Sequence, residues 1–173
     1  RNEIESIKTL NYIDVVDSIG EWDVSEKQNG TVMAWYKDED GDNLYEVYIG
    51  SNDIVRTNPD ATKLFAFLRN LTDIDLSNID TSITTNMLGM FGELSNLEIL
   101  DVSKLNTSNV TNMRAMFGNN YNTKLKEIIG IENFDTRKVT NMTAMFQLCQ
   151  NLRYLYLNNF DTSNVTDMSH MFY

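Results

Sequence analysis

The chain has 173 residues, of which 42% are hydrophobic and 10% aromatic, so it has enough apolar material for a packed core and too much for a disordered chain. Its formal charge of −11, from 25 acidic and 14 basic residues, disfavours nucleic acid and anionic membranes as partners. The single cysteine, Cys149, excludes an internal disulfide and a C-x-x-C zinc pair, and no run of about 18 apolar residues predicts a membrane span.

The N-terminal third contains one clear structural signal. Residues 1–30 have no clear period, and "IESIKTLNYIDVVDSI" is compatible with a helix or with a pair of strands. The segment "TVMAWYKDEDGDNLYEVYIG" (31–50) alternates on both sides of a turn-rich "KDEDGDN", which predicts a β-hairpin. We expect residues 1–63 to form an N-terminal segment in which this hairpin caps the rest of the chain.

A repeat organises the remainder, residues 64–173. Five phenylalanines follow one another at intervals of 26, 26, 29 and 26 residues, namely Phe65, Phe91, Phe117, Phe146 and Phe172. Periods in the twenties are the length of leucine-rich repeats, in which no unit can bury its apolar face alone and stacking supplies the core.

The first half of each repeat predicts a strand. "LTDIDLSNI" (71–79), "LEILDVSKL" (97–105) and "LRYLYLNNF" (152–160) match L-x-x-L-x-L with a further apolar residue three positions later. Alternation within them separates an inward from an outward face. The third copy, "LKEIIGIENF" (125–134), has one inserted residue near Gly130, which predicts a bulge, and follows the additional residues of "GNNYNTK" (118–124), which predict a longer loop.

The second half of each repeat predicts a short helix. "NMLGMF", "NMRAMF", "NMTAMF" and "DMSHMF" place apolar side chains at i, i+3 and i+4, and polar "DTSNVT"-type segments before them suit a turn with a helix N-cap. The predicted fold is therefore an α/β solenoid: a leucine-rich-repeat array with a parallel sheet and short helical returns, preceded by the N-terminal hairpin cap. We expect the last unit, which ends at Tyr173, to be truncated. We expect the natural protein to continue, with end-to-end association through the open face as the alternative.

These motifs resemble the repeats of BspA-like leucine-rich-repeat bacterial surface proteins, whose repeat of about 26 residues has the core F-D-T-S-N-V-T-N-M-S-x-M-F. "FDTSNVTDMSHMF" (160–172) follows this pattern except at Asp167 and in the variable slot, and "LNTSNVTNMRAMF" (105–117) and "FDTRKVTNMTAMF" (134–146) depart at two or three positions. "IDTSITTNMLGMF" (79–91) is the loosest copy.

The resemblance implies a secreted protein on the bacterial cell surface that binds host matrix, mucus or other cells, with no catalytic residue. It also marks a departure from general leucine-rich repeats, because Ile79, Leu105, Phe134 and Phe160 stand where many such repeats place an Asn or Cys ladder. We therefore expect apolar rather than hydrogen-bonded packing at these turns.

The acids of the hairpin turn raise the possibility of a calcium site. Asp38, Asp40 and Asp42 alternate as hard oxygen ligands do, but Gly41 precedes the third acid and Glu46 falls at the wrong distance for an EF-hand. A solvated turn is the favoured interpretation, and we expect no metal or other cofactor.

The only histidine and the only thiol do not suggest catalysis. Cys149 comes three residues after Phe146, in register with Leu68 and Leu94, which predicts a core position. His170 occupies a repeat slot otherwise held by glycine or alanine, and we expect it to be exposed or half-exposed. The methionines at helical spacing are predicted core residues rather than copper ligands. We therefore expect no enzyme.

Packing does not dictate the outward positions of the predicted strands, and these are our ligand-binding candidates. They form two columns: Asp73, Ile99, Glu127 and Tyr154, then Asp75, Asp101, Ile129 and Tyr156. The sheet face is the usual ligand surface of a solenoid, and exposed tyrosines are common interface anchors.

Two functions fit these patterns. The first is a non-enzymatic binding module on the bacterial cell surface, which adheres through this face to a host extracellular protein, a mucin or another glycan, without inserting into a membrane. The second is a structural spacer that holds another domain away from the cell wall, for which the tyrosines would simply pack against a further repeat. The strand columns differ between repeats while the core columns do not, which favours binding.

Overall fold

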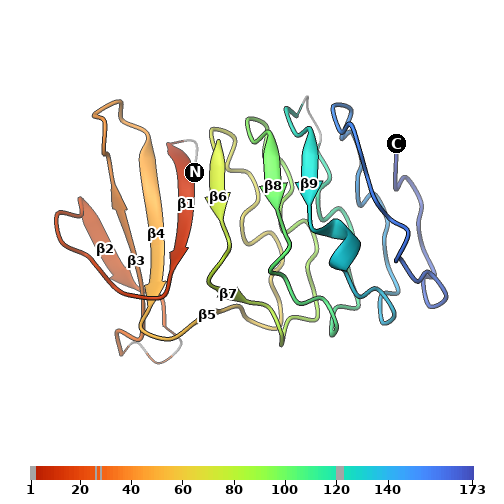
Figure 1. The fold of residues 1–173 in the computed structure, drawn as a ribbon, viewed down its shortest axis with the longest axis horizontal. Helices are drawn as coiled ribbons and strands as arrows, with labels where there is room; N and C mark the ends of the chain where they lie inside the picture. The colour runs from red at the N-terminus through yellow and green to blue at the C-terminus, as the bar shows by residue number, and fades with distance from the viewer. Residues whose placement is uncertain (1–2, 26, 28, 120–122) are drawn as a thin grey trace.

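The computed structural model describes residues 3–25, 27, 29–119 and 123–173. Its strands are β1 (Ile4–Leu10), β2 (Gly20–Asp23), β3 (Val32–Lys37), β4 (Tyr45–Ser51), β5 (Val55–Arg56), β6 (Asp73–Asp75), β7 (Ile79–Asp80), β8 (Ile99–Asp101) and β9 (Glu127–Ile129). A 3-10 helix, η1 (Ile131–Asn133), follows β9. Figure 1 shows the N-terminal strands at one end of an elongated molecule and the repeats side by side toward the C-terminus.

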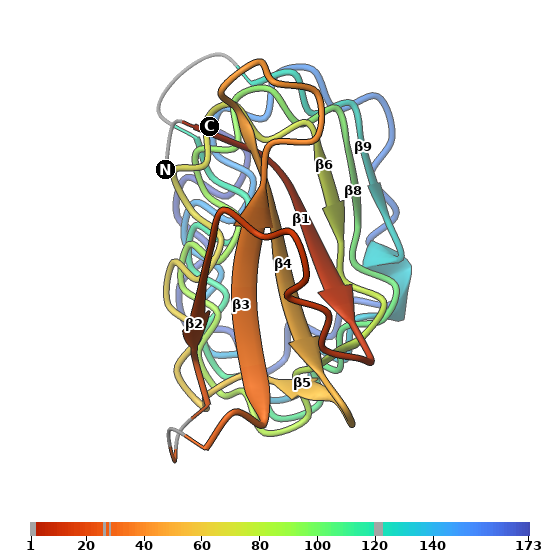
Figure 2. The same cartoon turned by 90° about the vertical axis from the view of Figure 1, so that its left-hand side faces the viewer.

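The N-terminal strands form one sheet with the first repeat. Its strand order is β2-β3-β4-β1-β6, in which β3 and β4 pair antiparallel, as the hairpin pattern predicts, while β1 is parallel to both β4 and β6. Because β6 lies within residues 64–173, the sheet crosses the boundary expected between the two parts of the chain. Figure 2 shows this sheet from the N-terminal end, with the repeats behind it.

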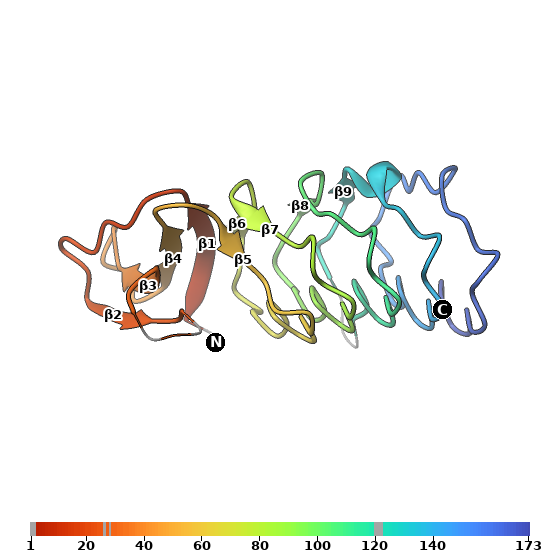
Figure 3. The same ribbon diagram turned by 90° about the horizontal axis from the view of Figure 1, so that it is seen from below.

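The repeats are irregular coils stacked along one axis (Figure 3). A column of aromatic rings runs through them, with centroids of neighbouring rings 5.5–6.0 Å apart, formed by Phe65, Phe91, Phe117, Phe146 and Phe172. The methionines of the same segments line the core, and Met87, Met90, Met113, Met116, Met142 and Met145 are fully buried. The predicted core positions of these repeats are thus confirmed as buried, whereas Met168 and Phe172 of the last repeat are exposed, which the prediction did not foresee.

The predicted α/β solenoid with helical returns is wrong. The described residues contain no α-helix, and their strands form three separate sheets, with β5-β7 and β8-β9 apart from the five-stranded sheet, rather than one continuous parallel sheet. The fourth copy of the strand motif, residues 152–157, forms no strand, and the insertion near Gly130 leads into η1 rather than into a bulge. The loop expected at 118–124 includes residues 120–122, which lie outside the described residues.

Backbone geometry explains why the returns are not helices. Each one contains a residue with a left-handed backbone, with φ of 58° at Gly89, 50° at Ala115, 56° at Ala144 and 57° at His170, and such a residue ends a right-handed helix. Alternate N–H groups therefore bond to the next coil, and most of those between them bond three residues back rather than to residue i−4. The N–H of Met87, for example, donates to the Asn112 carbonyl at 2.9 Å.

Candidate functional site

The strand face comprises the eight outward side chains predicted as ligand-binding candidates. In β6, β8 and β9 the middle residue is buried and the residues on both sides of it are exposed. The last coil continues this pattern, because Tyr154 and Tyr156 are 66% and 59% exposed. The eight side chains that the structure leaves on this face are Asp73, Asp75, Ile99, Asp101, Glu127, Ile129, Tyr154 and Tyr156.

One half of this face is acidic, and we call Asp73, Asp75 and Asp101 the acidic half. A groove of about 590 Å³ lies within it, lined by Asp73, Ile99 and Asp101 together with Lys124. The groove falls where the sheet is interrupted, because β6 ends the five-stranded sheet and β8 pairs only with β9. Glu98 also lines the hollow, which therefore brings together three carboxylates and one exposed aliphatic side chain.

Two carboxylates of the acidic half accept hydrogen bonds from backbone N–H groups, but none of the three forms an ion pair in the described part of the chain. Asp75 accepts a hydrogen bond from the Ser77 N–H at 2.8 Å, and Asp101 accepts one from the Ser103 N–H at 2.9 Å. In the described part of the chain the ion pairs are Arg56–Asp80, Lys126–Glu98 and Arg137–Asp135, so no acid of the strand face takes part in one.

The other half is apolar and aromatic, and we call Ile129, Tyr154 and Tyr156 the aromatic half. The two tyrosine rings are nearly parallel, with an interplanar angle of 12° and centroids 6.4 Å apart. Ile129 is 40% exposed on β9, the preceding strand. The aromatic half therefore offers a partner a large contact area. Its side chains have few rotatable bonds, so the cost in conformational entropy on binding is small.

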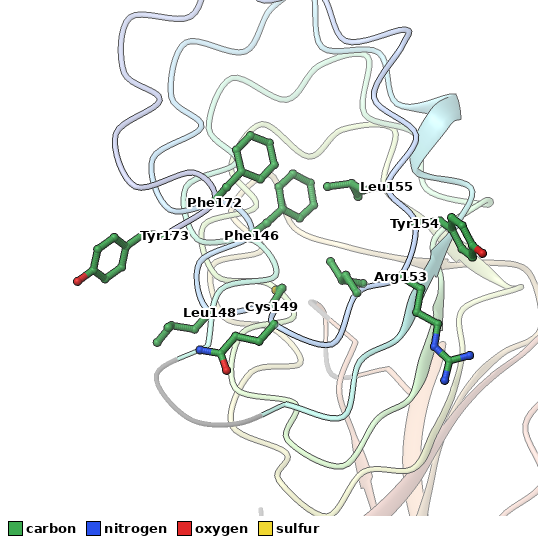
Figure 4. Close-up of a pocket in the computed structure, with 10 residues that line it drawn as sticks. Phe146, Leu148, Cys149, Arg153, Tyr154, Leu155, Phe172 and Tyr173 are labelled. Carbon is green, nitrogen blue, oxygen red and sulfur yellow. The ribbon is translucent and has the colours of Figure 1, made fainter.

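The C-terminal end of the stack has its own hollow, of about 320 Å³, which Figure 4 shows. Phe146, Cys149, Leu155 and Phe172 line it, and Tyr154 stands at its edge toward the strand face. Phe172 is 65% exposed here, whereas the other four phenylalanines of the ring column are buried. The hollow is thus the continuation of the core of the stack, not a separate polar site.

Neither Cys149 nor His170 has the surroundings of a catalytic side chain. Cys149 is partly buried rather than fully in the core, and its thiol donates to the Phe117 carbonyl at 3.2 Å. Burial raises the pKa of this thiol to about 11, which keeps it protonated and unreactive at neutral pH. His170 is exposed, in T-shaped contact with Tyr173.

The hairpin acids lie close together, with carboxylate oxygens of Asp38, Asp40 and Asp42 within 4.8 Å of one another. Asp38 accepts hydrogen bonds from the N–H groups of Gly41 and Asn43, and the other two carboxylates accept from N–H groups two residues ahead. This is the bonding of a turn that caps itself.

A threonine ladder was missed by the sequence reasoning. The positions expected to pack by apolar contact do so, since Ile79, Leu105 and Phe134 are buried. Two residues after each of them, however, a buried threonine bonds to the next coil. The Thr107 hydroxyl, for example, donates to the Asp135 carbonyl at 3.1 Å and accepts from the Asp135 N–H at 2.8 Å.

Thr81 and Thr136 make the same two bonds, to Asn106 and Asp161. The prediction that these turns would not be hydrogen-bonded is therefore wrong. The recurring D/N-T pair in the sequence was the signal that could have indicated the ladder.

Coils joined by a hydroxyl ladder, with one outward face that changes from coil to coil, define the chain as a repeat protein. Its sequence matches the profile of the family described as "Mycoplasma protein of unknown function, DUF285" over residues 59–127 and 120–173, and the chain belongs to this family. No curated protein and no solved structure matches the sequence significantly. Among the described residues, no helix has the length and apolar character needed to cross a membrane.

Proposed function

We propose that the chain is a non-enzymatic binding module of a BspA-like protein on the bacterial cell surface, and that it adheres through the strand face to a host or neighbouring-cell protein or glycan. Membership of a Mycoplasma family supports a bacterial source. The motif F-D-T-S-N-V-T-x-M-x-x-M-F supports the BspA-like assignment and, with it, an extracellular location.

One observation carries the proposal. The inward positions repeat nearly unchanged from coil to coil, whereas the outward positions of the strands change from Asp to Ile to Tyr. Tyr154 and Tyr156 are 66% and 59% exposed, and they lie beside a half-exposed isoleucine rather than being scattered singly. Contiguous exposed apolar side chains rimmed by polar ones are typical of interaction surfaces.

The test is a binding screen against extracellular matrix proteins, mucins and a glycan array. We compare the wild-type chain with the double variant Tyr154→Ala, Tyr156→Ala, and use Tyr173→Ala as the control. Tyr173 is 74% exposed, and Figure 4 places it on the opposite side of the terminal hollow from Tyr154. Its substitution therefore removes an equal ring away from the strand face.

We expect at least one ligand that the double variant no longer binds and that the Tyr173→Ala variant still binds, with unchanged circular dichroism for both. Equal binding by the double variant would contradict a role for the strand face. If the wild-type chain binds none of these proteins and glycans, the result would favour the alternative function, a spacer that holds another domain away from the cell wall.

A further inference from the structure

The strand face combines two properties that select a kind of partner. Its apolar side chains cross it diagonally, because Ile99 lies opposite Glu127 and Ile129 lies opposite Asp101 in the β8–β9 pairing. Ile99 is 53% exposed and Ile129 is 40% exposed, and the tyrosines extend the apolar track onto the last coil. Carboxylates lie on both sides of this track.

In the described part of the chain, none of these carboxylates forms an ion pair. Lys8 is paired with Asp75 across β1 and β6, but its ammonium group lies over the ring of Tyr48, 5.5 Å from the centroid. Lys126 is bound to Glu98 at 2.7 Å. Lys124 lines the groove together with three acids, Asp73, Asp101 and the already paired Glu98.

We propose that the strand face binds a protein partner through a basic segment. Lys or Arg side chains of the segment pair with the acidic half, and its apolar side chains pack on Ile99 and the aromatic half. The inference rests on the proposed function and narrows its ligand from a protein or a glycan to a basic protein surface. The net charge of −11 adds long-range attraction for such a partner.

A protein segment fits this face better than a glycan does. Three aspartates and a glutamate, none of which is ion-paired among the described residues, repel acidic sugars, and two exposed isoleucines offer no hydrogen bonds to neutral ones. Arg and Lys side chains, in contrast, carry aliphatic stems that pack along isoleucine while their charged ends reach a carboxylate. The groove between β6 and β8, with Ile99 between two aspartates, has the polarity such a side chain needs.

The test uses a phage-displayed library of random 12-residue peptides, selected on the immobilised chain in 50 mM NaCl. Peptides that also bind the Tyr154→Ala, Tyr156→Ala variant are removed. The affinities of the remaining peptides are then measured for the Asp73→Asn, Asp101→Asn double variant. Asn keeps the shape of Asp and can still accept from the Ser103 N–H, so only the charge is lost.

The matched control is Asp53→Asn, Glu21→Gln, which removes two exposed charges away from the strand face. We expect the enriched peptides to be rich in Lys or Arg next to apolar residues. Their affinity should fall about two- to thirtyfold in the Asp73, Asp101 variant, as expected for two exposed ion pairs, and should stay unchanged in the control. It should also weaken as NaCl is raised to 300 mM.

Neutral or acidic enriched peptides, or equal affinity for the charge variant and the wild type, would overturn the inference. A glycan array run with the same proteins separates this failure from failure of the proposed function. Glycan binding that requires the two tyrosines, with no basic peptide enriched, would leave the binding module standing and refute the basic partner. If neither probe binds the folded chain, both proposals fail.

Discussion

The threonine ladder makes a quantitative prediction about what joins one coil to the next. Thr107 is 3% exposed, and its hydroxyl both donates to and accepts from the backbone of Asp135 in the following coil. Thr107→Val keeps the shape of the side chain but leaves that N–H and that carbonyl without their partner. Each unsatisfied buried group costs about 1–3 kcal/mol. Both groups are affected at once, but Asp135 is only half-buried, so we expect the lower part of the sum, a loss of about 2–4 kcal/mol in the free energy of unfolding.

The assay is thermal and urea unfolding followed by circular dichroism. For a chain of this length the expected loss lowers the Tm by about 4–16 °C. Thr111→Val is the matched control, because Thr111 is exposed and its hydroxyl makes a single bond, to the Thr85 carbonyl at 3.2 Å. It should change the stability by less than about 0.5 kcal/mol.

Thr107→Ser separates hydrogen bonding from packing, since it keeps the hydroxyl and loses one methyl group, worth about 0.8 kcal/mol. A Thr107→Val variant as stable as the wild type would refute the ladder as a source of stability. A Thr107→Ser variant as unstable as Thr107→Val would show that the methyl group, not the hydroxyl, is what matters.

Three further predictions concern single sites. Gly130 has φ of 83°, and a Cβ there would overlap the backbone of Ser103, so Gly130→Ala should cost more than about 2 kcal/mol in urea unfolding. A hydrogen bond with Glu46, together with burial, raises the pKa of Glu5 from 4.5 to about 7. The folded chain thus binds a proton more tightly than the unfolded chain, and stability should fall as pH rises from about 4.5 to 7; Glu5→Gln should flatten this slope. Cys149, whose pKa is raised from 9.0 to about 11, should react with iodoacetamide at pH 8 about a hundred times more slowly in the folded chain than in urea, as measured by mass spectrometry.

Burial could be predicted from the sequence better than backbone conformation. The register of the phenylalanines identifies side chains that are buried in the structure, such as Met90 and Phe117. The i, i+3, i+4 spacing of these side chains suggested a helix, but two successive tight turns also direct such positions to one side. The Met90 N–H bonds to the Met87 carbonyl and the Gly92 N–H to the Gly89 carbonyl, three residues back in each case. Apolar spacing alone cannot separate these two backbones.

Long-range pairing was the part that could not be predicted. The start of the chain forms β1, which lies between β4 and β6 and is parallel to both. Its residues lack a regular alternation because both faces of β1 are covered, with Ser6 and Ile7 both buried although they point to opposite sides. The acidic half of the strand face was predicted residue by residue, but the groove in it was not. That groove lies between β6, which pairs with β1, and β8, which pairs with β9 and not with β6.

The stacking of the coils explains why only the outward face is free to vary. Phe117 lies 6.0 Å from Phe91 and 5.5 Å from Phe146, so a change of this ring disturbs two interfaces at once. An outward residue such as Tyr156 has no such neighbour within the core and can change without cost to folding. A spacer needs only the inward pattern, and charged side chains at every outward position would serve its solubility best. Two adjacent tyrosines, each more than half exposed, work against solubility; a spacer needs a further repeat to cover them, whereas a binding surface uses them exposed as they are here.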